Sequence, residues 1–116
     1  MTMLSGNPRM TDAEFESMAD ATLAAVARAL DKAELDADVE AKGTGVLELE
    51  FADGSKMVIN RHTAAREIWV AARSGGFHFR YHEGAWRDTR NGAELYAALS
   101  QMVSAQGAAA VNLAPD

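Results

Sequence analysis

The chain of 116 residues contains no cysteine. Without cysteine there can be no disulfide, no thiolate metal site and no cysteine nucleophile, and an iron–sulfur cluster cannot be bound through its usual ligands. No apolar run approaches the ~18–20 residues that a membrane-spanning helix needs. The first ten residues lack both the pattern of a signal peptide and the Arg-rich pattern of a mitochondrial presequence. These absences predict a cytoplasmic protein of bacterial type that spans no membrane.

Basic residues are scarce in the first third of the chain. Residues 12–40 contain nine acidic and two basic side chains, whereas residues 41–116 contain eight of each. The formal net charge of -6 therefore arises almost entirely in the first third. Such a charge distribution repels nucleic acid and attracts cations or a basic protein surface. We therefore expect no nucleic-acid partner.

Hydrophobic patterning predicts two helices separated by a series of strands. Thr11 and Glu14 match a capping box, and apolar residues then recur at helical spacing as far as Leu30. A second helix is expected after the strands, with Asn91 as its N-cap. Alternation of apolar and polar residues predicts the strands themselves within residues 36–40, 46–51, 55–60, 67–73, 77–82 and 85–87.

Short connections between these strands favour an antiparallel sheet, and two amphipathic helices can cover one of its faces. The predicted fold class is therefore α+β: a two-layer sandwich with two terminal helices packed on one face of an antiparallel sheet of five to six strands. We expect a single domain at residues 11–113, preceded by a flexible leader at residues 1–10 and followed by a tail at residues 114–116.

The carboxylates of residues 12–40 are the first candidate site. Carboxylate oxygens are hard ligands that suit Fe³⁺, Mn²⁺, Ca²⁺ and Mg²⁺, and a cation relieves the repulsion among crowded carboxylates. The sequence offers no His/Cys cage and no Glu-x-x-His pair, so metal binding should be weak, exposed and poorly selective. An ordinary solvated acidic face is the alternative that the residues leave open.

Trp69 marks the second candidate site, on the sheet face opposite the helices. If its two apolar neighbours point to the core, Trp69 points to solvent, where a tryptophan often marks a protein contact. A tryptophan partly covered by a loop is the alternative. His62, His78 and His82 have no spacing that closes a metal site, and we interpret them as surface histidines.

Several segments, taken together and in order, resemble the bacterial frataxin (CyaY) family. They lie between about Met10 and Leu113. The resemblance implies the frataxin fold, a role in iron handling and the regulation of cysteine desulfurase during iron–sulfur cluster assembly. The segments are Thr11-Asp12-Ala13-Glu14-Phe15, the acidic strand, Phe51-Ala52-Asp53-Gly54-Ser55-Lys56-Met57-Val58-Ile59-Asn60-Arg61, Ile68-Trp69-Val70-Ala71, Ser74-Gly75-Gly76-Phe77-His78-Phe79, Trp86 and Asn91-Gly92.

The resemblance also implies site residues. Ala27, Arg28 and Lys32 depart from the family pattern, which predicts fewer or weaker metal sites than in more acidic relatives. Glu16 stands where some relatives carry a metal-binding histidine, which predicts a preference for harder ions. The expected metal-binding carboxylates, called the acidic ridge below, are Asp12, Glu16, Asp20, Asp31, Glu34, Asp36, Asp38 and Glu40. The expected partner-binding residues are Asn60, Arg61, Trp69 and His78, with Arg66, Arg73 and Arg80 as a basic fringe.

The resulting hypothesis is a non-enzymatic, iron-binding regulator of iron–sulfur cluster assembly. It would hold Fe²⁺ or Fe³⁺ weakly and dock on cysteine desulfurase and on the iron–sulfur scaffold protein. A monomer is expected, with an iron-dependent oligomer as the alternative. One rival hypothesis is an acidic interaction module with incidental metal binding. Another is a ferroxidase, which needs a defined site with an open coordination position.

Overall fold

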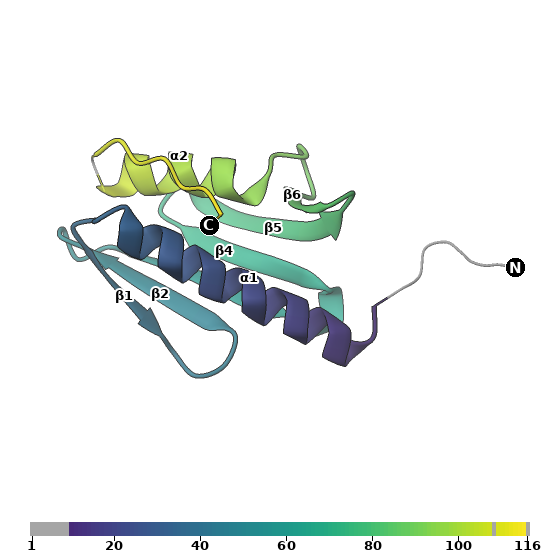
Figure 1. Ribbon diagram of the computed structural model, residues 1–116. Coiled ribbons are helices and arrows are strands. Elements are labelled where there is room, and N and C mark those ends of the chain that lie inside the picture. Colours follow the sequence, from purple (N-terminus) through teal and green to yellow (C-terminus); the bar gives the residue numbers. More distant parts are fainter. Residues whose placement is uncertain (1–9, 108, 116) are drawn as a thin grey trace, which may run out of the picture.

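The computed structural model describes residues 10–107 and 109–115, and in them it shows two helices and six strands (Figure 1). A single turn of 3₁₀ helix, η1, interrupts the strands. The elements in chain order are α1 (Asp12–Lys32), β1 (Ala37–Ala41), β2 (Val46–Phe51), β3 (Lys56–His62), η1 (Thr63–Ala65), β4 (Glu67–Ala72), β5 (Gly75–His82), β6 (Ala85–Asp88) and α2 (Leu95–Gly107).

The six strands form one antiparallel sheet in the order β1-β2-β3-β4-β5-β6. Because every strand pairs with its neighbours in sequence, short hairpin connections suffice. Both helices lie on the same face of the sheet (Figure 1). The predicted fold class, two terminal helices on one face of an antiparallel sheet, is confirmed, with six strands.

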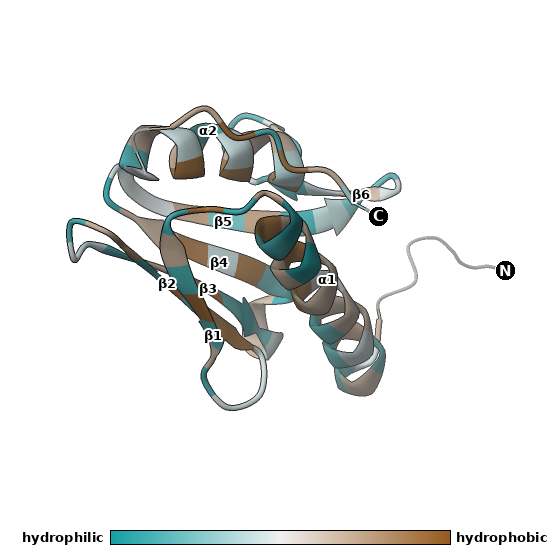
Figure 2. Cartoon of the chain, turned by 60° about the vertical axis from the view of Figure 1, so that its left-hand side comes forward, coloured by the Kyte–Doolittle hydropathy of each residue, from teal (hydrophilic) through white to brown (hydrophobic). Residues whose placement is uncertain are grey.

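The hydrophobic core fills the space between the helices and the sheet, where Figure 2 shows hydrophobic residues along the strands beneath the helices. Phe15 of α1 is fully buried and meets Trp86 of β6 edge to face, with ring centroids 6.0 Å apart. The Trp86 indole N–H donates to the hydroxyl of Thr22 at 2.9 Å. This hydrogen bond satisfies the polar atom of an indole that is otherwise buried.

Helix α1 begins where the sequence predicted. The Thr11 hydroxyl accepts a hydrogen bond from the Glu14 backbone N–H at 3.0 Å, and the Glu14 carboxylate accepts one from the Thr11 N–H at 2.8 Å. The predicted capping box is therefore confirmed. It fixes the register of α1 and hence the positions of the ridge carboxylates along it.

Helix α2 begins later than predicted, and Asn91 is not its N-cap. Gly92 has φ +77°, a left-handed conformation that a helix starting at this point could not contain. The Asn91 side chain instead accepts a hydrogen bond from the Ala93 N–H. The carboxylate of Glu94 accepts hydrogen bonds from the first backbone N–H groups of α2, at Tyr96 and Ala97.

The C-terminal segment runs back along α2. The Ser100 hydroxyl accepts a hydrogen bond from the Leu113 N–H, and Leu113 is buried. At the other end, Met10 packs against the core. Residues 1–9 and 116 lie outside the described residues, so the predicted leader and tail stay predictions. In the part of the chain that the structure describes, neither helix combines the length and apolar character needed to cross a bilayer.

Candidate functional site

The C-terminal half of the acidic ridge spans the end of α1 and strand β1. Asp31 lies in the last turn of α1, and the chain turns at Glu34, whose φ of 53° is left-handed. Asp36 precedes β1. Asp38 and Glu40 alternate with half-buried apolar residues, so both project from the outer sheet face. All five carboxylates are exposed.

A groove of about 340 Å³ separates the end of α1 from β1. Asp31 and Glu34 line it together with apolar residues such as Leu30 and Val39, and Asp38 also borders it although its side chain alternates with those of Ala37 and Val39. The carboxylates at the groove therefore come mainly from the end of α1 and the turn that follows it. A cation, or the basic side chain of a partner, would find several negative charges there.

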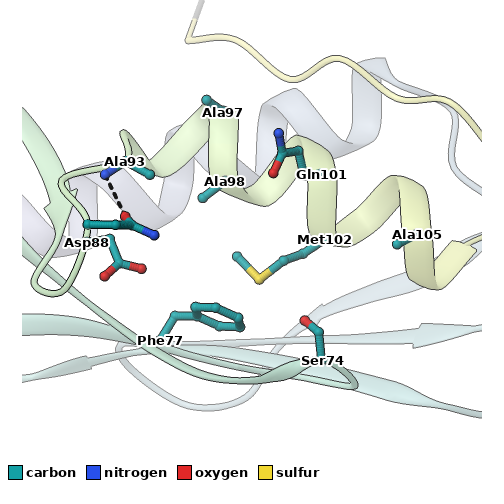
Figure 3. Close-up of a pocket in the computed structure, with 10 residues that line it drawn as sticks. Ser74, Phe77, Asp88, Ala93, Ala97, Ala98, Gln101, Met102 and Ala105 are labelled. Atoms are coloured by element: carbon teal, nitrogen blue, oxygen red, sulfur yellow. Dashed lines mark hydrogen bonds between the residues drawn. The ribbon is translucent and has the colours of Figure 1, made fainter.

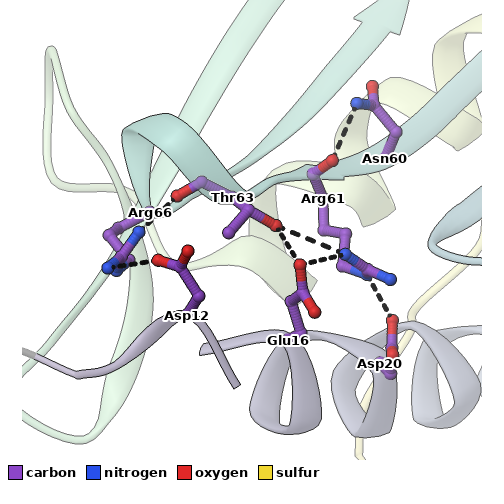
Figure 4. Close-up of polar contacts among 7 residues, drawn as sticks. All are labelled: Asp12, Glu16, Asp20, Asn60, Arg61, Thr63 and Arg66. Carbon is purple, nitrogen blue, oxygen red and sulfur yellow. Dashed lines mark hydrogen bonds and ion pairs between the residues drawn. The ribbon is translucent and has the colours of Figure 1, made fainter. Parts of the chain in front are cut away.

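The N-terminal half of the ridge is paired with arginines (Figure 4). Arg61 of β3 places its guanidinium 2.7 Å from Asp20 and 3.1 Å from Glu16. Arg66, which follows η1, lies 2.7 Å from Asp12. The charges of these three predicted metal ligands are thus neutralised within the protein. Beside each carboxylate, a guanidinium group occupies the position that a metal cation would take.

The absence of a side chain at Gly45 leaves room for the Arg61 side chain, which extends to α1. The Arg61 N–H donates to the Gly45 carbonyl oxygen at 2.9 Å. A Cβ at Gly45 would lie 2.5 Å from Arg61 Nε, closer than real contacts allow. The Arg61 side chain is only 16% exposed, which confirms that it lies between the sheet and α1.

Lys42 joins the ridge to the next strand. Its ammonium lies 3.1 Å from Glu40 and 3.6 Å from Glu48, and these two acids face each other across β1 and β2. The hydrogen bond and charge of Glu40, with a smaller contribution from Glu48, raise the pKa of Lys42 above its ordinary value. The cation thereby reduces the repulsion between two like charges placed opposite each other.

The described residues contain no group of three or more His, Cys, Asp or Glu side chains arranged to hold a metal ion. The ridge as described consists of separate carboxylates, some exposed and some paired with arginine. The roles predicted for individual ridge residues are not tested by these observations and stay predictions.

The second candidate site is a stack of three rings on the outer sheet face. The Trp69 indole lies between two imidazoles, with centroid distances of 3.8 Å to His62 and 4.4 Å to His78. Both interplanar angles are 10°, so the rings are nearly parallel. Trp69 lies on the outer face as expected, but its neighbours on β3 and β5, rather than a loop, cover its two faces. We call His62, Trp69 and His78 the ring stack.

Glu67 is hydrogen-bonded to the ring stack, a role that was not predicted from the sequence. Its carboxylate accepts a hydrogen bond from the Trp69 indole N–H at 2.8 Å and one from the Arg80 guanidinium at 2.6 Å. His78 Nδ1 lies 3.3 Å away. Glu67 is 5% exposed, so its charge is buried among these donors. The spacing of two residues between Glu67 and Trp69 was the available signal, because it places both on one face of a strand.

The four predicted partner-binding residues do not share one surface. Asn60 pairs with Trp69, and Trp69 pairs with His78, across β3, β4 and β5, so these three lie together on the outer face. Arg61 projects to the opposite face, toward α1. In the predicted basic fringe, each arginine has an acidic partner: Arg66 with Asp12, Arg73 with Asp53 and Arg80 with Glu67.

A separate groove of about 290 Å³ lies between α2 and β5 (Figure 3). Phe77 of β5 and Met102 of α2 line it with apolar side chains from opposite sides, and small alanine side chains of α2 line it as well. The buried Asp88 also lines it, and accepts a hydrogen bond from the Arg90 N–H at 2.7 Å. This groove shares no residue with the ridge or the ring stack.

The chain is similar in sequence to the proteins of one known family. The family model described as the frataxin-like domain matches residues 8–109. An iron-sulfur cluster assembly protein CyaY from Ralstonia nicotianae is 52% identical over 112 residues, which cover 94% of this chain and 99% of the relative. The protein of the same name from Dechloromonas aromatica is 51% identical over 104 residues, covering 90% and 99% of the two chains.

Solved structures that resemble this chain in fold include two frataxins. Frataxin from Psychromonas ingrahamii superposes with a TM-score of 0.81 at 31% identity, covering 89% of this chain and 97% of its own. A trimeric frataxin from the yeast Saccharomyces cerevisiae, complexed with ferrous iron, gives a TM-score of 0.62 at 27% identity, covering 88% and 90%. With a family model that spans most of its length and relatives more than 50% identical over nearly all of it, the chain belongs to the frataxin (CyaY) family.

Proposed function

We propose that this protein acts in iron–sulfur cluster assembly as a cytoplasmic binding protein rather than an enzyme. Its relatives bear the name of iron-sulfur cluster assembly proteins. The observation that carries the proposal is the concentration of exposed carboxylates at Asp31, Glu34, Asp36 and Asp38, none of which takes part in the arginine pairs of the N-terminal half. A surface of this kind fits a basic surface on a partner protein.

The proposed partners are cysteine desulfurase, for the C-terminal half of the ridge, and the iron–sulfur scaffold protein, for the outer sheet face around Asn60 and Trp69. The ridge would meet a basic groove on the desulfurase. Because both surfaces are exposed, ionic screening should weaken the complex, and its dissociation constant should increase with salt.

Charge reversal tests this docking. Asp36→Lys changes the net charge by two units in the ridge, and Glu83→Lys makes the same change at an exposed position in the turn between β5 and β6. We expect the ridge variant to weaken desulfurase binding about tenfold or more and the control variant about twofold or less. Calorimetric titrations at low and high salt would measure both. Equal losses in the two variants would refute docking through the ridge.

Iron would be cargo on the same ridge, held weakly by exposed carboxylates. The solved structure of the yeast relative in complex with ferrous iron supports iron as the metal. Because arginines neutralise Asp12, Glu16 and Asp20, iron should first affect residues 31–40. Titration with Fe²⁺ under anaerobic conditions, followed by amide NMR shifts, checks this. Silence throughout residues 12–40 would favour the second candidate function, an acidic interaction module, which the arginine pairing supports.

A further inference from the structure

The groove between α2 and β5 contains a buried carboxylate, that of Asp88, which is 5% exposed. Its Oδ1 atom accepts the Arg90 backbone N–H at 2.7 Å. In the part of the chain that the structure describes, Oδ2 accepts no hydrogen bond and no basic side chain pairs with the carboxylate. The Arg90 guanidinium instead contacts Gly76 and Phe77. A buried carboxylate in this state favours a ligand that brings a donor and a positive charge to Oδ2.

The groove is elongated, with apolar side chains along its length. Asp88, which lies opposite Phe79 in the sheet, is at one end, and Ser74 is at the other (Figure 3). Phe77 and Met102 lie between these ends. The rise of an extended strand makes the distance from Ser74 to Phe79 about 16 Å. A second cavity of about 190 Å³ continues at the Ser74 end, where the two share lining residues. An extended segment of a few residues would fit this length.

The edge of the sheet beside the groove is open. β6 ends opposite Phe79, so residues 75–77 of β5 pair with β4 alone within the described sheet. On this open edge, the Gly76 carbonyl oxygen accepts a hydrogen bond from the Arg90 guanidinium at 3.0 Å. A side chain there takes the place of the backbone N–H of a further strand. Because open strand edges bind extended peptides through main-chain hydrogen bonds, a segment of protein suits the groove better than a compact small molecule.

Lysine matches the chemistry of the groove better than arginine does. The apolar stem of a lysine can lie along Phe77 and Met102 while its ammonium group reaches Asp88. Arginine binds a carboxylate best through both oxygens at once, and the Arg90 N–H already takes one of them. An ammonium group needs a single point of contact, which Oδ2 provides, and it neutralises the buried charge.

We propose that the groove between α2 and β5 binds an extended segment of a partner protein, in which a lysine pairs with Asp88 and the main chain bonds to the open edge of β5 at Gly76. Arg90 would release the Gly76 carbonyl oxygen as the segment binds. The groove shares no residue with the acidic ridge or the ring stack, so it is separate from the docking described under the proposed function. The molecule would then have a third interaction surface.

The probe is the acetylated and amidated peptide Leu-Thr-Lys-Thr-Leu, and its control carries uncharged norleucine in place of lysine. Each is titrated into the full chain at constant ionic strength, and NMR shifts of the Gly76 amide and the Met102 methyl group give the dissociation constants. We expect the lysine peptide to bind about threefold or more tighter than its control. Asp88→Asn, which keeps an oxygen for the Arg90 N–H, should abolish this difference. Glu83→Gln, which removes an exposed charge elsewhere, should leave it intact.

A larger side chain in the groove tests the apolar contacts. Ala98 of α2 lines the groove, so Ala98→Leu should weaken the binding of both peptides about threefold or more. Ala24→Leu, at an exposed position of α1, makes the same change away from the groove and should leave both dissociation constants as they are in the parent. Equal effects of the two substitutions would contradict binding in the groove.

Three other results would overturn the proposal: no shifts at Gly76 and Met102, shifts confined to residues 31–40, or equal binding of the lysine and norleucine peptides by the parent protein. The last comparison needs no variant, so it stays decisive if Asp88→Asn does not fold. Titration with n-butylammonium tests the other source of an ammonium group. If it binds as tightly as the lysine peptide, the occupant is a small amine and the proposed protein segment is wrong.

Discussion

The position of the Arg61 side chain depends on the absence of a side chain at Gly45. Gly45 has φ +79°, and any Cβ added there meets the Arg61 side chain. Gly43, with φ +70°, is the matched control, because nothing lies within 4 Å of a Cβ there. Alanine at either position should cost about 1–2 kcal/mol for its left-handed backbone. Gly45→Ala should cost about a further 1 kcal/mol for overpacking. Urea unfolding of both variants measures the difference, and equal losses would show that Arg61 moves aside without cost.

Asp53, in the turn between β2 and β3, gives a prediction about pH. Hydrogen bonds from the Ser55 hydroxyl at 2.7 Å and the Ser55 N–H at 2.9 Å, aided by the charge of Arg73, hold the pKa of Asp53 below its ordinary value of 3.8. Since the folded pKa is depressed, the ionised carboxylate stabilises the fold above the unfolded pKa. This contribution is lost as pH falls from about 4 through the folded pKa.

Ser55→Ala should therefore raise the pKa of Asp53 toward 3.8 and flatten the acid limb of the stability curve. Carbon-13 NMR titration of the Asp53 carboxyl measures the first effect, and urea unfolding at a series of acid pH values measures the second. Ser17→Ala, at an exposed position of α1, is the control and should change neither. An Asp53 pKa that is the same in parent and Ser55→Ala would contradict this account.

At the scale of helices and strands, the features that the sequence predicted correctly are those that depend on residues close together in the chain. The capping box of Thr11 and Glu14 and the alternation along each strand depend on residues near one another in the chain, and both were confirmed. The start of α2 was missed because the left-handed Gly92 overrides the capping preference of Asn91.

The candidate site was less predictable because its contacts join distant residues. The ring stack requires the cross-strand register that brings His62 and His78 against Trp69. Pairing of Arg61 with Glu16 requires the placement of α1 over β3. Neither is visible in the pattern of a single element. Composition along the chain identified the ridge carboxylates but could not show which of them the arginines neutralise.

The contact between α1 and β3 gives a prediction about metal. Arg61→Gln removes the cation that pairs with Glu16 and Asp20, whose side chains are 41% and 42% exposed. After allowing for solvent screening, the loss should be about 1–2 kcal/mol of unfolding free energy. Mn²⁺ should then raise the melting temperature of the variant more than that of the parent, because two carboxylates lack their internal cation.

Arg73→Gln is the control, since it removes an exposed arginine that pairs with Asp53 outside the ridge. Differential scanning calorimetry with and without Mn²⁺ provides the measurement. If Mn²⁺ shifts both variants equally, then Arg61 does not occupy a place that a metal ion could take.

At the scale of the whole molecule, the arginine pairs leave the excess negative charge at residues 31–40. Repulsion among these carboxylates should lower the melting temperature at low salt, and divalent cations should raise it. Asp36→Asn should reduce both responses, whereas Glu83→Gln, at an exposed acid in the turn between β5 and β6, should leave most of them. Thermal melts across a series of salt and Mg²⁺ concentrations test this. A melting temperature indifferent to both would contradict a repulsive ridge.

Strand β1 lies at the edge of the sheet, with β2 as its one partner in it. An edge strand offers unpaired backbone groups on which the strand of another molecule can add, and charged side chains are a known protection against such growth. Asp38 and Glu40 supply that protection at this edge. The residues proposed to attract a basic partner therefore also discourage aggregation between copies. Removing their charge would weaken docking and, at the same time, open a route to fibrous assembly at high protein concentration.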